Sequence, residues 1–100
     1  KLPFWLSPQQ VVIANISDKH AEFAEKINKT LKKEGFRCSL DLRNEKIGYK
    51  IRELIIAKIP YIVIIGDKEV SAGKISVREN DGTEHNLISV NDFLGKLRNN

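Results

Sequence analysis

The stretch DLRNEKIGYKIR, residues 41–52, decides the fold, because it joins a predicted strand to a predicted helix. Apolar and polar residues alternate over 36–42, as is typical of a strand with one buried face. Apolar residues then recur at helical spacing from about 46 to 58, and Pro60 ends that helix. The junction carries four cations and an asparagine where the backbone N–H groups of a new helix point outward. Such a strand-to-helix junction is a candidate site for a polyanion.

Upstream of the junction, the pattern predicts one strand and one helix. The continuous apolar run within residues 10–16 is typical of a central strand that is covered on both faces. Ser17 or Asp18 then caps a helix whose apolar residues recur at i, i+3 and i+7. Gly35 ends this helix in the left-handed conformation that glycine tolerates best.

Downstream of the junction, residues 61–65 form the most apolar run, which predicts the innermost strand. A second charged loop is expected over 66–73. Strands over 74–79 and 84–88 flank an Asn-Asp-Gly-Thr hairpin turn. Ser89 then opens a last helix with one apolar side.

This order predicts an α/β fold: a single domain with a five-stranded mixed sheet flanked by three helices. The first three strands are expected to be parallel, so their carboxyl ends gather at one edge, where open α/β sheets bind ligands. Both charged loops leave strands at that edge. The topology therefore predicts that Asn44, Lys46 and Glu69 lie near one another, and that Arg78 joins them from the outward face of the fourth strand.

The charge of the chain is concentrated in one segment. The net charge is +4 over 100 residues, and residues 43–78 hold eight Lys/Arg against four Asp/Glu, which accounts for all of it. This excess indicates either a polyanionic partner or a merely solvated surface. No apolar run is long enough to cross a bilayer, so no membrane partner is expected. The single Cys38 fits a reducing compartment, which indicates a cytoplasmic protein.

Several kinds of catalytic site are excluded by spacing. Residues 66–74 resemble a phosphate-binding loop, but six residues separate the two glycines where four are needed, and Ile75 replaces the magnesium-binding Ser/Thr. His20 and His85 have no second Cys or His at metal-ligand spacing. Cys38 alternates onto the apolar face and is expected to be inert core. We therefore expect no catalysis, no metal and no cofactor in this chain.

With catalysis excluded, the function class that remains is recognition of a binding partner. Arg and Asn bind base edges through paired donors and acceptors, Glu accepts from the amino groups of guanine, and Lys binds phosphates. The exposed bases of single-stranded RNA loops suit such contacts. Trp5 is interpreted as structural packing in preference to nucleotide stacking. For the charged residues ion pairs are the alternative: Glu69 with Lys68 or Lys46, and Arg43 and Arg52 with Glu45 or Glu53.

These stretches resemble the C-terminal anticodon-binding domain of threonyl-tRNA synthetases, which are class II aminoacyl-tRNA synthetases. The same domain type serves prolyl, histidyl and glycyl synthetases, so the assignment to threonine depends on the Arg-Asn-Glu-Lys and Gly-Asp-Lys-Glu sequences. The matching residues follow the order of the family over almost the whole chain: 5–8, 10–11, 41–48, 50–53, 59–61, 66–70 and 73–74.

The resemblance implies the class IIa anticodon-binding domain fold over residues 10–100, with residues 1–9 as a lead-in from a missing N-terminal catalytic region. It implies that the domain binds the anticodon loop of threonine tRNA, chiefly the G and U at the second and third positions. Position by position, the implied base readers are Asn44, Lys46, Glu69 and Arg78. The implied contacts to the RNA backbone are Arg43, Lys50, Arg52 and Lys68.

The resemblance also implies a parent enzyme, a homodimeric threonine–tRNA ligase that uses ATP, Mg and Zn in its catalytic domain. A C-terminal extension that contacts tRNA is expected to be missing after Asn100. One alternative is a protein-interaction or accessory-subunit domain of the same fold. Another is a flavodoxin-like enzyme that binds a small phosphate ligand. The residues after Gly73 have the pattern of a strand and not of a helix, which counts against this alternative.

Overall fold

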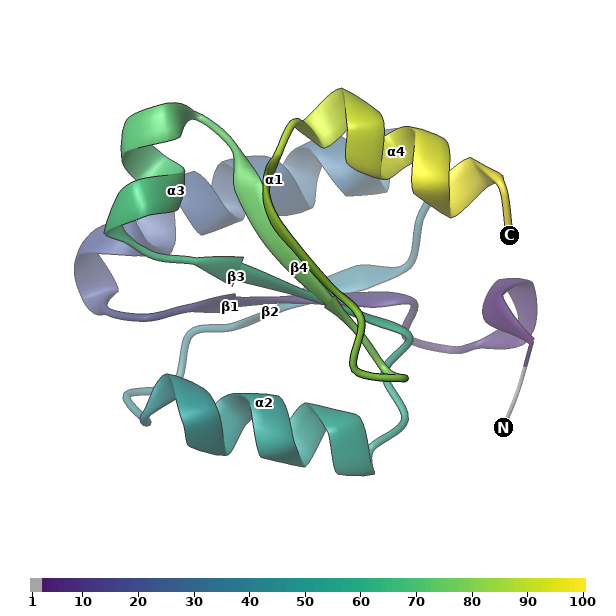
Figure 1. Cartoon of the computed structure of the whole chain (residues 1–100), viewed down its shortest axis with the longest axis horizontal. Coiled ribbons are helices and arrows are strands. Elements are labelled where there is room, and N and C mark those ends of the chain that lie inside the picture. Colours follow the sequence, from purple (N-terminus) through teal and green to yellow (C-terminus); the bar gives the residue numbers. More distant parts are fainter. Residues whose placement is uncertain (1–2) are drawn as a thin grey trace.

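Five strands form one mixed sheet in the order β2-β1-β3-β4-β5, seen in Figure 1. The structure is a computed structural model and describes residues 3–100, so the first two residues of the expected lead-in lie outside the described residues. β1 (Val11–Asn15) pairs in parallel with β2 (Cys38–Asp41) and with β3 (Tyr61–Ile65). β4 (Ile75–Glu79) runs antiparallel to β3 and to β5 (Glu84–Ile88). The predicted α/β domain with a five-stranded mixed sheet is confirmed, with β2 at one edge and β3 in the middle.

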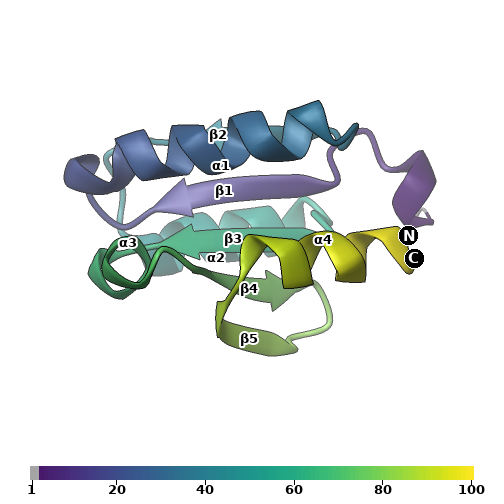
Figure 2. The same ribbon diagram turned by 90° about the horizontal axis from the view of Figure 1, so that it is seen from above.

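Helices cover both faces of the sheet. α2 (Ile47–Ile56) lies on one face, and α1 (Ala21–Lys33) and α4 (Val90–Arg98) lie on the other, as Figures 1 and 2 show. Successive residues of a strand point to opposite faces, so the continuous apolar run of β1 supplies both. Val11 and Ile13 join the larger core under α1 and α4, whereas Val12 joins the smaller core under α2.

The predicted ends of α1 and the predicted start of α4 are found where the sequence places them, whereas α2 ends at Ile56, before the predicted residue 58. Ser17 caps a short 3-10 helix, η2 (Asp18–His20), which continues directly into α1. Gly35 follows α1 with a φ of 93°. The Asp92 N–H donates to Ser89 Oγ at 3.0 Å and so caps α4. These local signals work because each depends on a hydrogen bond or a backbone angle within a few residues.

The predicted loop over 66–73 is wrong in part, because it contains a fourth helix, α3 (Asp67–Ala72). Glu69 accepts a hydrogen bond from the Gly66 N–H at 2.8 Å, which satisfies a donor at the helix start. Gly73 ends the helix with a φ of 66°. Six residues are too few to show an apolar period, so the capping pattern was the only available signal.

Within the expected lead-in, a short 3-10 turn is found, η1 (Phe4–Leu6). Phe4 makes an edge-to-face contact with Tyr61, and Trp5 stacks on Phe36 with ring centroids 5.7 Å apart. The Trp5 indole N–H also donates to the carbonyl oxygen of Asn100 at 2.8 Å, which ties this turn to the C-terminal end. These contacts support the structural interpretation of Trp5.

Candidate functional site

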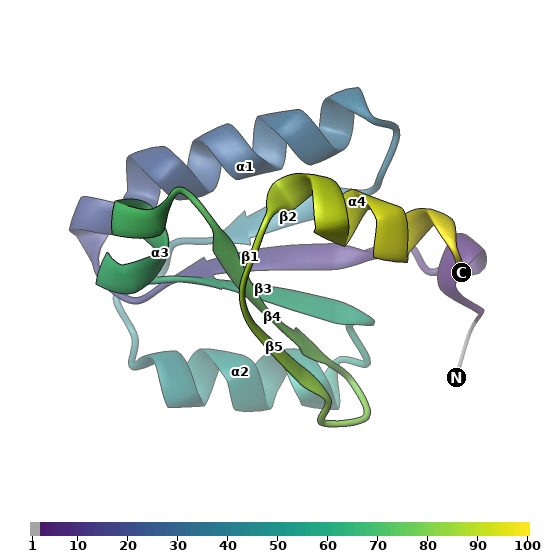
Figure 3. The same ribbon diagram turned by 45° about the horizontal axis from the view of Figure 1, so that its top comes forward.

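The carboxyl ends of the three parallel strands meet at one edge of the sheet, where the turn before α2 and helix α3 lie (Figure 3). Asn44, Lys46 and Lys68 are exposed there. Lys46 stands immediately before α2, and its carbonyl oxygen accepts the N–H of Tyr49 at 3.1 Å. The edge therefore presents an amide and two ammonium groups to solvent.

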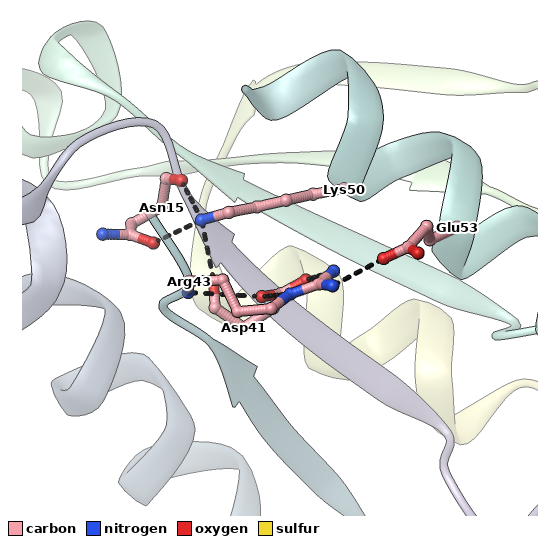
Figure 4. Close-up of polar contacts among 5 residues, drawn as sticks. All are labelled: Asn15, Asp41, Arg43, Lys50 and Glu53. Atoms are coloured by element: carbon pink, nitrogen blue, oxygen red, sulfur yellow. Dashed lines mark hydrogen bonds and ion pairs between the residues drawn. The ribbon is translucent and has the colours of Figure 1, made fainter. Parts of the chain in front are cut away.

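Lys50, of which a contact to the RNA backbone was expected, does not lie in solvent. The residue is only 1% exposed. Its ammonium group donates to the Asn15 carbonyl and side-chain oxygens, both at 2.9 Å, and to the Asp41 carbonyl at 3.1 Å (Figure 4). All three donors are thus used, which is what makes a buried lysine tolerable. Burial lowers the pKa of Lys50, and the nearby Asp41 carboxylate opposes that shift.

Arg43 forms one ion pair that was its alternative interpretation, with Glu53, and a second that was not predicted, with Asp41. Its Nε and Nη2 donate to the two carboxylate oxygens of Asp41, each at 2.8 Å, and Nη1 lies 2.6 Å from Glu53 Oε1 (Figure 4). The hydrogen bond from Arg43 is the main cause of the lowered pKa of Asp41 and of Glu53. The residue therefore joins the end of β2 to the middle of α2 and is not a freely moving cation.

Glu69 is 8% exposed, and its partners within residues 3–100 are neither Lys68 nor Lys46. One carboxylate oxygen accepts the Gly66 N–H, and the other accepts the Ser76 hydroxyl at 2.7 Å. Glu69 thus fastens α3 to β4. A carboxylate has about four acceptor sites, so these two hydrogen bonds leave further lone pairs for a ligand.

A hollow of about 340 Å³ lies between α2 and β4. Arg78 faces the same side of the sheet as its cross-strand partner Ile62, which packs in the α2-side core. Its Nε is buried without a hydrogen-bond partner within residues 3–100, and its Nη1 is 3.9 Å from Glu84 Oε1. The hollow is lined by apolar side chains, by two guanidinium groups and by one glycine, which has no side chain. These residues are Gly48, Ile51, Arg52, Ile55, Ile56 and Arg78.

The expected site residues come from three segments: the turn before α2, helix α3 and strand β4. Asn44 and Lys46 lie before α2 begins, whereas Arg78 pairs with Ile62 in the first half of β3. Glu69 reaches the same face as Arg78, because its partner Ser76 is two residues away on β4. The hollow between α2 and β4 is lined by both Arg78 and Gly48, which stands two residues after Lys46.

Sequence reasoning missed the buried position of Lys50, although the signal was present. The residue lies three positions after Ile47 and four before Leu54, so it flanks the apolar stripe of the helix. Its partner Asn15 could not be foreseen, since it stands 35 residues away in the chain. Ser76 was assigned no role, yet its hydroxyl holds Glu69.

The remaining polar candidates are structural. His20 is buried, accepts the Ser17 N–H at Nδ1, and lies 2.7 Å from Asp67 through Nε2, which lowers the pKa of Asp67. Burial raises the pKa of the Cys38 thiol, so it is a poor nucleophile. No group of three or more His, Cys, Asp or Glu within residues 3–100 is placed to hold a metal ion.

Across the described part of the chain, no helix combines the length and the apolar character that crossing a bilayer requires.

The sequence and the fold were compared with known proteins. The family model described as "Anticodon binding domain" matches residues 10–100. The chain is 49% identical over 98 residues to a threonine–tRNA ligase of Ralstonia nicotianae and 52% identical over 97 residues to that of Legionella pneumophila strain Corby. These matches cover 98% and 97% of this chain but only 15% of either relative, so the chain spans a small part of their length.

A solved structure agrees with these relatives. The RNA binding domain of threonyl-tRNA synthetase from Cryptosporidium parvum Iowa II superposes with a TM-score of 0.93 at 33% sequence identity. The match covers 99% of this chain and 25% of that one. The chain therefore belongs to the anticodon binding domain family, in the form that threonyl-tRNA synthetases carry.

Proposed function

We propose that this domain binds the anticodon loop of threonine tRNA, so that its parent enzyme charges that tRNA with threonine. The observation that carries the proposal is Arg78, whose buried Nε has no partner within residues 3–100 and which lines the hollow beside α2. An arginine fork with free donors suits the O6 and N7 acceptors of guanine. The apolar side chains of Ile51 and Ile55 form one wall of the hollow, against which the base can pack.

The other residues along α2 support contacts to the same loop. Asn44 is exposed and offers a donor and an acceptor to a second base edge. The free lone pairs of Glu69 accept from the amino group of a base that enters beside Ser76. Arg52 and Lys68 are exposed and contact phosphates, whereas the buried Lys50 does not. Lys46, also exposed, lies at a base edge as the resemblance implies, and its charge adds to binding of the RNA backbone.

The proposal extends to the parent protein. The chain corresponds to 15% of the length of its curated relatives, whose names describe threonine–tRNA ligases. We place the domain in such a ligase, a homodimeric cytoplasmic enzyme whose ATP, Mg and Zn sites belong to a catalytic domain outside this chain. In that arrangement the domain contributes tRNA recognition and no chemistry, as the structural roles of His20 and Cys38 suggest.

The direct test measures binding of the 100-residue chain to an RNA stem-loop that carries the threonine anticodon. Arg78→Ala should weaken binding and reduce the preference for guanine at the second anticodon position by roughly 1–3 kcal/mol. Lys29→Ala is a matched control, since it removes one exposed cation from α1 on the other side of the sheet. Its guanine preference should equal that of the unmodified chain.

Two outcomes would overturn the proposal. If Arg78→Ala binds every loop as the unmodified chain does, the hollow is not the guanine site. If the chain binds no anticodon loop at all but associates with a protein in a salt-insensitive way, the interaction-domain alternative holds instead.

A further inference from the structure

We propose that Arg43 and Tyr49 form a flat shelf on which an unpaired base of the bound loop stacks. The inference rests on the proposed function and adds a second kind of contact to it. It concerns the surface beside Asn44, which is distinct from the hollow that Arg78 lines.

The guanidinium plane of Arg43 is held in place. Three of its five N–H groups are directed to carboxylate oxygens, two at Asp41 and one at Glu53. Those two carboxylates come from the end of β2 and from α2, so the plane cannot rotate without breaking contacts to both elements. The side chain is nevertheless 47% exposed. A planar surface that is fixed and open to solvent is thus already formed.

The ring of Tyr49 lies against one side of this plane and supports it. The guanidinium carbon of Arg43 stands over the ring at 5.9 Å from its centroid, which is within the range of a cation–π contact. An interaction of the Tyr49 hydroxyl with Glu53 raises the pKa of Tyr49, so Glu53 lies beside both members of the pair. Tyr49 is 45% exposed, so part of its ring is accessible to a base.

The charges around Arg43 argue against the phosphate contact that was expected of it. The cluster of Asp41, Arg43, Lys50 and Glu53 contains two positive and two negative groups, so its net charge is zero. A neutral cluster attracts a phosphate weakly, but its flat face remains available to a base. Bases of single-stranded RNA stack on aromatic rings and on guanidinium planes with little dependence on sequence. The shelf should therefore contribute affinity more than base preference.

The test combines variants with a fluorescent base. Tyr49→Leu and Arg43→Lys should each weaken binding of the anticodon stem-loop by roughly 5- to 150-fold, the range of one stacked base. Tyr49→Phe keeps the ring and should bind as the unmodified chain does. Arg43→Lys keeps the positive charge, so weaker RNA binding by this variant would come from loss of the planar guanidinium group. The salt dependence of binding should be unchanged in Tyr49→Leu, because no phosphate contact is removed.

A second measurement needs no variant to fold. With 2-aminopurine placed at each loop position in turn, the unmodified chain should quench its emission at one position on binding. If no position is quenched, or if folded Tyr49→Leu binds with full affinity, the shelf does not exist. If the chain binds no anticodon loop, the proposed function itself fails. If Arg78→Ala loses guanine preference while Tyr49→Leu binds normally, only the shelf fails.

Discussion

The ammonium group of Lys50 lies 2.9 Å from both oxygens of Asn15, the carbonyl of its main chain and that of its side chain. A third hydrogen bond reaches the carbonyl of Asp41, where β2 ends. One side chain from the first half of α2 thus joins the carboxyl ends of two neighbouring strands (Figure 4). The turn that carries Asn44 lies between these anchors, so the buried lysine limits where the turn can sit.

Replacing Lys50 by methionine should lower the free energy of unfolding by about 2–4 kcal/mol, since it leaves buried carbonyl oxygens without donors. Lys46→Met, on the exposed side of the same turn, should change stability by no more than about 0.5 kcal/mol. Chemical denaturation of both variants measures the difference.

RNA binding also distinguishes the two lysines. Lys46→Met should reduce the slope of log affinity against log salt concentration by about one, and folded Lys50→Met should leave that slope unchanged. A reduced slope in Lys50→Met would show that this side chain reaches phosphate.

The ion pair between Asp41 and Arg43 should make stability depend on acid pH. The hydrogen bond from Arg43 is the main cause of the lowered pKa of Asp41 in the folded state. A carboxylate of this kind stabilises the fold above its ordinary pKa of about 3.9, and that stability is lost as the pH falls through the lowered folded value. In Asp41→Asn this contribution is absent at every pH. The difference in unfolding free energy between the two chains should therefore be large near neutral pH and shrink in acid. A difference that stays constant from neutral to strongly acid pH would contradict this origin.

Trp5→Ala should destabilise the domain by roughly 1–3 kcal/mol without weakening RNA binding, since the ring is half exposed and yet stacks on Phe36. The variant also loses the hydrogen bond to Asn100. Leu6→Ala is the control, because Leu6 is far more exposed in the same turn. Thermal unfolding and stem-loop titration test the two halves of the prediction. A drop in RNA affinity with unchanged stability would instead assign Trp5 to nucleotide stacking.

Much of the fold could be predicted because its signals are local. The apolar runs at 11–15 and 61–65 are long enough to mark central strands, and Gly35 and Ser89 act through bonds to residues a few positions away. Helix α3 could not be predicted in this way. Its six residues show no period, and Glu69 holds it partly through Ser76, which belongs to the next strand.

The amino-acid order by itself determined the parallel first three strands, the edge at which their loops meet, and the basic segment that follows. Only the tertiary structure decided which of those cations face solvent. Lys46, Arg52 and Lys68 do, whereas Lys50 is enclosed and Arg43 is bound between two carboxylates. The physical reason is that a buried charge is stable only with hydrogen-bond partners, and Asn15, the partner that supplies two of them to Lys50, lies 35 residues away.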